Sequence, residues 1–210
     1  MMGAFIPQGE VLAIASFTFL VSVALAYLSV SKYLMKRNEM WLWYSLAFIS
    51  NLIATGIQEV WALGYSDIIT SAVYMFLVAE LVLFFSFGSA TQLPEKWFRA
   101  YKYYGIAASL VLLLGIIAQP ANIVEDYMPM NYPMPAVGAS MVVTIPSTGL
   151  ILFLAGRALL YKGSNKYKLI SIVLGVIVLS AGGMFAASGF WWALYASEVV
   201  GMTLLLAGVY

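Results

Sequence analysis

Seven apolar segments, separated by short polar stretches, follow one another along the chain. They cover about residues 11–33, 40–62, 69–91, 101–119, 136–160, 168–188 and 190–210. A helix needs roughly 20 residues to cross the hydrocarbon core of a bilayer, and every segment meets or approaches that length. The pattern therefore predicts an all-α membrane protein with a single seven-helix transmembrane domain over residues 1–210.

The composition supports a membrane protein and excludes several kinds of metal, cofactor and thiol chemistry. Hydrophobic residues make up 63% of the 210 residues and charged residues only 9%, whereas soluble domains are nearer half apolar and a quarter charged. The chain has no histidine and no cysteine, which excludes haem with His ligands, the usual zinc sites, iron–sulfur clusters and thiol catalysis. It also carries no nucleotide-binding or nucleophile motif. We therefore expect no cofactor, no metal site and no enzymatic activity.

The basic residues predict the orientation. All ten lie in, or at the edges of, the connections between segments one and two, three and four, and five and six: Lys32, Lys36, Arg37, Lys96, Arg99, Lys102, Arg157, Lys162, Lys166 and Lys168. The opposite side carries Glu10, Asp67, Glu125 and Asp126 and no base. The positive-inside rule then places the N-terminus outside and the C-terminus in the cytoplasm, with the plasma membrane as the expected location. This distribution indicates topology rather than nucleic-acid binding.

An internal repeat fits the segment order. Residues 79–82 align with residues 197–200 at an offset of 118, which superposes Glu80 on Glu198. The stretch Leu34-Met35-Lys36, which ends in a base after segment one, similarly corresponds to Leu160-Tyr161-Lys162 after segment five. These matches suggest a parallel 3+1+3 plan, in which segment four links two three-helix halves.

Two carboxylic acids, Glu80 and Glu198, fall near the middle of apolar segments. A charge at that depth is costly, and no lysine or arginine lies at the same level, so each acid must be protonated, hydrogen-bonded, hydrated or bound to a cation. Each is a candidate site for an ion, a proton or a substrate, and the alternative is a structural hydrogen bond between helices. Glu59 lies nearer the outer end of its segment, beside Trp61, where it reaches either the interface or the rim of a cavity.

Segment two also carries a polar stripe. Asn51, Thr55 and Gln58 are spaced i, i+4 and i+7, so they share one face of a helix, which we expect to point inward. The stripe either lines a polar cavity or makes hydrogen bonds between helices. In segment five, Pro146 interrupts the helical hydrogen-bond ladder and is a hinge candidate, with neighbouring hydroxyls available to the carbonyls it leaves free.

The topology is similar to that of SWEET and PQ-loop transporters and of microbial opsins. The chain lacks the Pro-Gln signature of the former in segments one and five, since Pro7-Gln8 precedes segment one. It also lacks the segment-seven lysine that binds retinal in the latter, and carries Glu198 in that segment instead. The Trp-rich second segment and the Leu-Pro…Trp stretch at 93–97 resemble seven-span sensor regions of histidine kinases. No family is assigned on these likenesses.

The leading functional interpretation is a small transporter or channel-like protein that moves an ion, a proton or a small solute. Glu80 and Glu198 would accept the proton or cation, and substitution of either by glutamine would stop movement. Two alternatives stay open: a seven-helix sensor or receptor-like signalling module, and a cofactor-free subunit of a larger membrane complex such as a respiratory one. The expected partners are the lipid bilayer and either other subunits or further copies of this chain.

Overall fold

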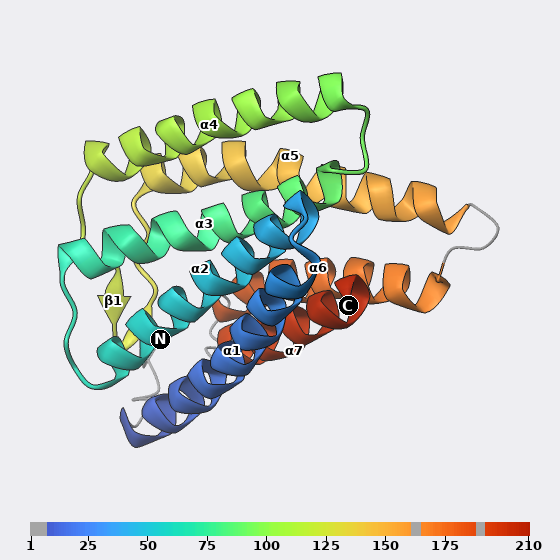
Figure 1. Cartoon of the computed structure of the whole chain (residues 1–210). Helices are drawn as coiled ribbons and strands as arrows, with labels where there is room; N and C mark the ends of the chain where they lie inside the picture. Colours follow the sequence, from blue (N-terminus) through green and yellow to red (C-terminus); the bar gives the residue numbers. More distant parts are fainter. Residues whose placement is uncertain (1–7, 161–164, 188–191) are drawn as a thin grey trace.

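The structure is a computed structural model that describes the backbone at residues 8–160, 165–187 and 192–210, and side chains there except at 180–187. Within these ranges it contains seven helices: α1 (Gln8–Lys36), α2 (Glu39–Ala62), α3 (Ile68–Ala90), α4 (Glu95–Ala118), α5 (Met134–Leu159), α6 (Lys166–Ala187) and α7 (Trp192–Val209). A short antiparallel hairpin, β1 (Val124–Glu125) and β2 (Met128–Pro129), lies between α4 and α5. Figure 1 shows α3, α4 and α5 running side by side, with α1 inclined to them.

Six of the helices, α1 to α5 and α7, are long and apolar enough to cross a membrane. The protein is therefore a helical integral membrane protein, as the apolar segments predicted. The helix ends differ most from the expected ones at α4, which begins at Glu95 rather than at residue 101. The polar residues Lys96 and Arg99 do not belong to an apolar segment, but a helix can continue beyond the hydrocarbon core into the interface.

Side-chain caps explain where α2 and α3 begin. The Asn38 side chain accepts a hydrogen bond from the Trp41 backbone N–H at 3.0 Å. The Asp67 side chain accepts one from the Thr70 backbone N–H at 2.6 Å. In return, the Asp67 backbone N–H donates to the Thr70 hydroxyl, which completes a capping box. Both caps satisfy N–H groups that the first helical turn leaves without a partner.

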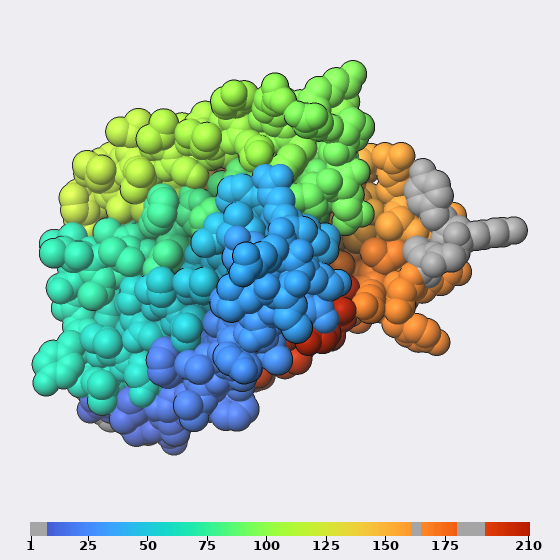
Figure 2. Space-filling model, in the orientation of Figure 1, coloured from blue at the N-terminus to red at the C-terminus, as the bar shows by residue number. Residues whose placement is uncertain are grey.

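The helices pack in a ring that is closed between α3 and α5, with α4 outside it. Each helix contacts the next, and α7 returns to contact α1. The helix α4 lies against α3 and α5, on the outside of the bundle (Figure 1). Figure 2 shows α1, in blue, on the surface of the packed molecule. Its exposed apolar side chains, including Phe17, Leu20 and Tyr27, are suited to contact with lipid.

The charges separate to opposite ends of the bundle because consecutive helices run in opposite directions (Figure 1). We call the end with Glu10, Asp67, Glu125 and Asp126 the acidic end, and the other the basic end. The described bases all belong to the basic end, where Lys102 Nζ lies 3.1 Å from Glu39 Oε1 and ties α4 to α2.

Two apolar clusters fill most of the interior. One joins α2, α3, α4 and α5 through residues such as Trp61, Leu83 and Leu112. The other joins α1, α2, α3, α5, α6 and α7 through residues that include Phe48, Phe85 and Met202. Polar side chains are buried beside both, and they define the candidate site.

Candidate functional site

Gln58 on α2 is the centre of a buried polar group. Its side chain is fully buried, and its Nε2 donates to the Tyr74 hydroxyl on α3 at 2.9 Å and to Glu198 Oε1 on α7 at 2.9 Å. We call Gln58, Tyr74, Tyr132, Tyr195 and Glu198 the Gln58 cluster. One amide thus connects a helix of the first three with a helix of the last three.

Helix geometry brings these residues to one level. Gln58 is four residues from the end of α2, and Tyr74 and Glu198 are each six residues from the start of their helices. At 1.5 Å per residue, all three lie about 6–9 Å along their helices from the acidic end. Tyr195 precedes Glu198 by three residues and therefore shares its face of α7.

Unpaired polar atoms concentrate at the Gln58 cluster. Among the described residues, five buried side-chain atoms have no hydrogen-bond partner. Four of these belong to the cluster or to Glu59 next to it: Gln58 Oε1, Glu59 Oε2, Tyr195 Oη and Glu198 Oε2. An unpaired buried polar atom costs about 1–3 kcal/mol. Such a concentration in one place is typical of a site that receives a ligand or a proton.

Glu59 joins the site from the side of α1. Its Oε1 accepts a hydrogen bond from the Ser16 hydroxyl at 2.7 Å. The Tyr195 hydroxyl lies within electrostatic reach of both Glu59 and Glu198. Tyr195 is fully buried, so its hydroxyl has no contact with the solvent.

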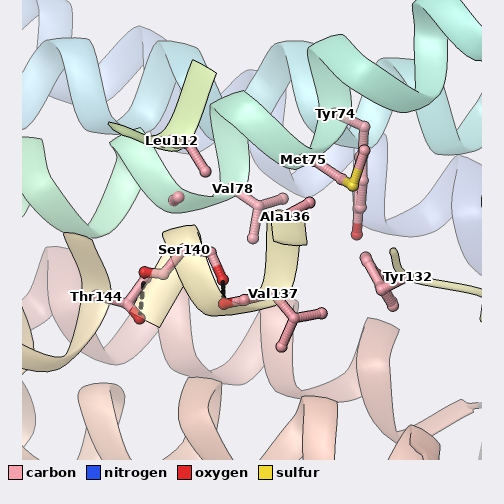
Figure 3. Close-up of a pocket in the computed structure, with 10 residues that line it drawn as sticks. Tyr74, Met75, Val78, Leu112, Tyr132, Ala136, Val137, Ser140 and Thr144 are labelled. Atoms are coloured by element: carbon pink, nitrogen blue, oxygen red, sulfur yellow. Dashed lines mark hydrogen bonds between the residues drawn. The ribbon is translucent and has the colours of Figure 1, made fainter. Parts of the chain in front are cut away.

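Tyr132, in the loop before α5, closes the cluster toward α3 and α5. Burial of its hydroxyl, more than the nearby charge of Glu198, raises the pKa of Tyr132 above its ordinary value. The residue as a whole is 40% exposed, and its side chain lies next to that of Tyr74 (Figure 3). The hydroxyl therefore keeps its proton at neutral pH and can donate a hydrogen bond.

A cavity of about 110 Å³ adjoins the cluster. In Figure 3, Tyr74 and Tyr132 point toward one another at one end of it, and Leu112 and Thr144 lie at the other. The hydroxyls of Ser140 and Thr144 donate to carbonyls of their own helix, so the remaining lining is mostly apolar. The cavity therefore offers space for a small apolar group next to a polar site.

The three residues of the predicted polar stripe on α2 do not share one set of partners. Asn51 Nδ2 donates to the Ser22 hydroxyl on α1 at 2.8 Å, and Thr55 donates to the Asn51 carbonyl within α2 at 3.0 Å. Both side chains are buried, as expected for an inward face. Of the three, Gln58 alone makes the bonds that form the cluster.

Glu80 and Glu198 lie in different places. Glu80 is buried twelve residues into α3, about 18 Å from the acidic end. It accepts a hydrogen bond from the Ser109 hydroxyl on α4. The structure therefore does not bring the two acids into one site, although the sequence alignment paired them.

Pro146 lies inside α5, and a side chain of α4 bonds to the carbonyl that this proline leaves free. A proline has no N–H for the carbonyl four residues earlier, which here is that of Val142. The Tyr104 hydroxyl donates to this carbonyl. One residue further on, Ser147 is 3.0 Å from the Tyr101 hydroxyl, which is 2.8 Å from Ser86 on α3. The expected neighbouring hydroxyls are thus supplemented by tyrosines of another helix.

Sequence reasoning did not single out the three tyrosines of the candidate site. Tyr74, Tyr132 and Tyr195 are three of 14 tyrosines in the chain, and tyrosine is also common at membrane interfaces. The i, i+3 spacing of Tyr195 and Glu198 was the one available signal. Among described residues, no group of three or more acids forms a metal site. No protein-family model, curated protein or solved structure matches this chain.

Proposed function

We propose that this protein is a small membrane transporter that moves a proton or another cation through the bundle, with Glu198 as the acceptor. The observation that carries the proposal is the hydrogen bond from Gln58 on α2 to Glu198 on α7, beside unpaired buried oxygens. A carboxyl in this position can exchange a proton or a cation with little change elsewhere, because its second oxygen has no partner to lose.

The distribution of polar and apolar residues along α2 and α7 supports a path. From the Gln58 cluster, Thr55 and Asn51 continue along α2 toward the basic end. An apolar barrier follows, formed by buried side chains of α2, α3 and α7: Phe48, Leu81, Phe85, Met202 and Leu205. Beyond it, a pocket of about 230 Å³ lies at the basic end, lined by Tyr44, Lys168 and Gly208 among others. This arrangement fits a transporter whose site is closed toward the basic end.

The proposal includes the membrane topology. Seven spans, an external N-terminus and a cytoplasmic C-terminus put the Gln58 cluster in the outer half and the pocket at the cytoplasmic face of the plasma membrane. The two three-helix halves joined by α4 would then meet at the Gln58–Glu198 bond. Both α2 and α7 would contribute to opening the site.

The test is proton and cation flux in proteoliposomes that contain the full chain and a pH-sensitive dye. Glu198→Gln keeps the shape of the side chain but cannot ionise, and we expect it to lower the flux at least tenfold. Glu125→Gln is the matched control, because Glu125 lies in the exposed hairpin and bonds to Asn131. Glu80→Gln should keep most of the flux, since Glu80 bonds to Ser109 away from the cluster.

Equal flux in Glu198→Gln and Glu125→Gln would overturn the proposal. Protein that is monodisperse in detergent and inserts equally into liposomes in each variant is required for the comparison. A flux lost equally in Glu80→Gln and Glu198→Gln would instead assign a role to both acids.

A further inference from the structure

We propose that the Gln58 cluster binds a primary ammonium group whose short apolar substituent occupies the cavity between α3 and α5. The inference rests on the proposed function and names the class of cation that the site takes. It is drawn from the type of unpaired atom, the charge around the site and the shape of the space next to it.

The unpaired atoms are mainly hydrogen-bond acceptors. Gln58 Oε1 is an acceptor only, and Glu198 Oε2 and Glu59 Oε2 are acceptors when the carboxyls are ionised. The two groups that carry Gln58 Oε1 and Glu198 Oε2 are bonded directly to each other through their other atoms, so both oxygens belong to one site. An ammonium group has three N–H donors and no acceptor, which matches this set.

The electrostatics of the acidic end favour a cation over an anion or a neutral ligand. Within the described residues, Glu10, Asp67, Glu125 and Asp126 belong to this end and all the bases belong to the other. Charge of one sign around a cleft raises the local concentration of the opposite ion. The unpaired Tyr195 hydroxyl adds a further oxygen that can accept a hydrogen bond from the cation.

The adjoining cavity sets the size of the ligand. Its volume of about 110 Å³ is smaller than the roughly 150 Å³ of an engineered cavity that binds benzene. A chain of about four carbons is of suitable size, by comparison with that benzene site. Tyr74 and Tyr132 belong to both the cluster and the cavity lining, so an amine in the cluster would place its substituent along them (Figure 3).

Isothermal titration calorimetry on the full chain in phosphatidylcholine nanodiscs tests the inference. The probes are butylammonium, methylammonium and tetramethylammonium chlorides at neutral pH. Tetramethylammonium has the same charge but no N–H donor, and we expect it to bind at least tenfold more weakly than butylammonium. We expect methylammonium to bind more weakly than butylammonium, because it leaves the cavity unfilled.

Two variants separate the parts of the site. Glu198→Gln should weaken butylammonium binding at least tenfold. Glu95→Gln is the unaffected control, because Glu95 is exposed at the basic end and pairs with Arg99. Ala136→Val narrows the cavity, since Ala136 is buried in its lining. It should weaken butylammonium binding while leaving methylammonium binding unchanged. The probe series on the unaltered protein tests the inference even where a variant fails to fold.

A primary ammonium also occurs in the headgroup of phosphatidylethanolamine, so a second titration uses nanodiscs that contain this lipid. A drop in apparent butylammonium affinity there identifies the headgroup as a competing ligand, and an unchanged affinity identifies a free amine. Butylammonium that binds no more tightly than tetramethylammonium overturns the inference. If Glu198→Gln still abolishes proton flux in that case, the proposed function stands without it. Amine binding without any flux would retain the binding site and reject transport.

Discussion

At the scale of single residues, Gln58 has a role that its neighbours on α2 do not share. Asn51 and Thr55 find partners on the adjacent helix α1 and within α2 itself, whereas Gln58 reaches two helices at once. Its amide uses the donor side for both bonds and leaves the oxygen unpaired. A side chain that held only two helices together would not need that free oxygen.

Asp67 provides a prediction at the same scale, outside the membrane-spanning segments. Hydrogen bonds from Thr70 lower its pKa below 3.8, since they stabilise the ionised carboxylate at the start of α3. A depressed pKa means that the ionised cap adds stability above the ordinary value, and that this stability is lost as the pH falls through the lower folded value. Asp67→Ala should therefore lower the midpoint of thermal unfolding at pH 6, and the difference should shrink between pH 4 and pH 2.

Thermal unfolding of the detergent-solubilised chain measures this difference. Asp67→Asn is the matched control, because asparagine caps a helix without ionising. Its difference from Asp67→Ala should not depend on pH over the same window. A constant difference between the native chain and Asp67→Ala from pH 6 to pH 2 would show that the charge contributes nothing.

At the scale of the element, α5 combines an internal proline with a partner on another helix. The Val142 carbonyl, which Pro146 leaves free, accepts from Tyr104. Tyr104→Phe should therefore destabilise the protein by about 1 kcal/mol, the typical net value of one hydrogen bond. In a Pro146→Ala background the alanine N–H can bond to the same carbonyl, so Tyr104→Phe should cost clearly less there.

A double-mutant cycle on unfolding free energies checks this coupling. Tyr103→Phe is the control, because Tyr103 is on the same helix and is exposed. Additive effects of Tyr104→Phe and Pro146→Ala would mean that the tyrosine does not compensate for the proline. A rigid, compensated proline would also give α5 less freedom than the hinge interpretation requires.

At the scale of the whole molecule, much of the fold could be predicted because apolar runs of membrane-spanning length have few other solutions. The inward position of Gln58 could be predicted from helix periodicity, and its side chain is buried. Its bond to Glu198 could not be predicted in this way. The separation of Glu80 from Glu198 could not be predicted, because it depends on the direction in which each helix face points within the ring. Tyr132 could not be predicted either, since it reaches the site from a loop whose path is set by tertiary packing.

The last prediction concerns the apolar barrier between the Gln58 cluster and the pocket at the basic end. Phe85 packs edge-on against Phe48, with ring centroids 5.1 Å apart, and both rings are buried. Phe85→Ala removes the larger part of this contact, at a cost of about 3–5 kcal/mol in stability. If the barrier limits passage, the same change should raise passive proton leak through proteoliposomes several-fold.

The control is Phe17→Ala, because Phe17 is 59% exposed on the outer surface of α1. Adding Glu198→Gln to Phe85→Ala distinguishes two origins of the leak. A leak that falls again in the double variant passes through the carboxyl site, because a proton must still be accepted at Glu198 before it reaches the widened barrier. A leak that is unaffected by Glu198→Gln follows another route, and a Phe85→Ala leak no greater than that of Phe17→Ala would place the barrier elsewhere in the bundle.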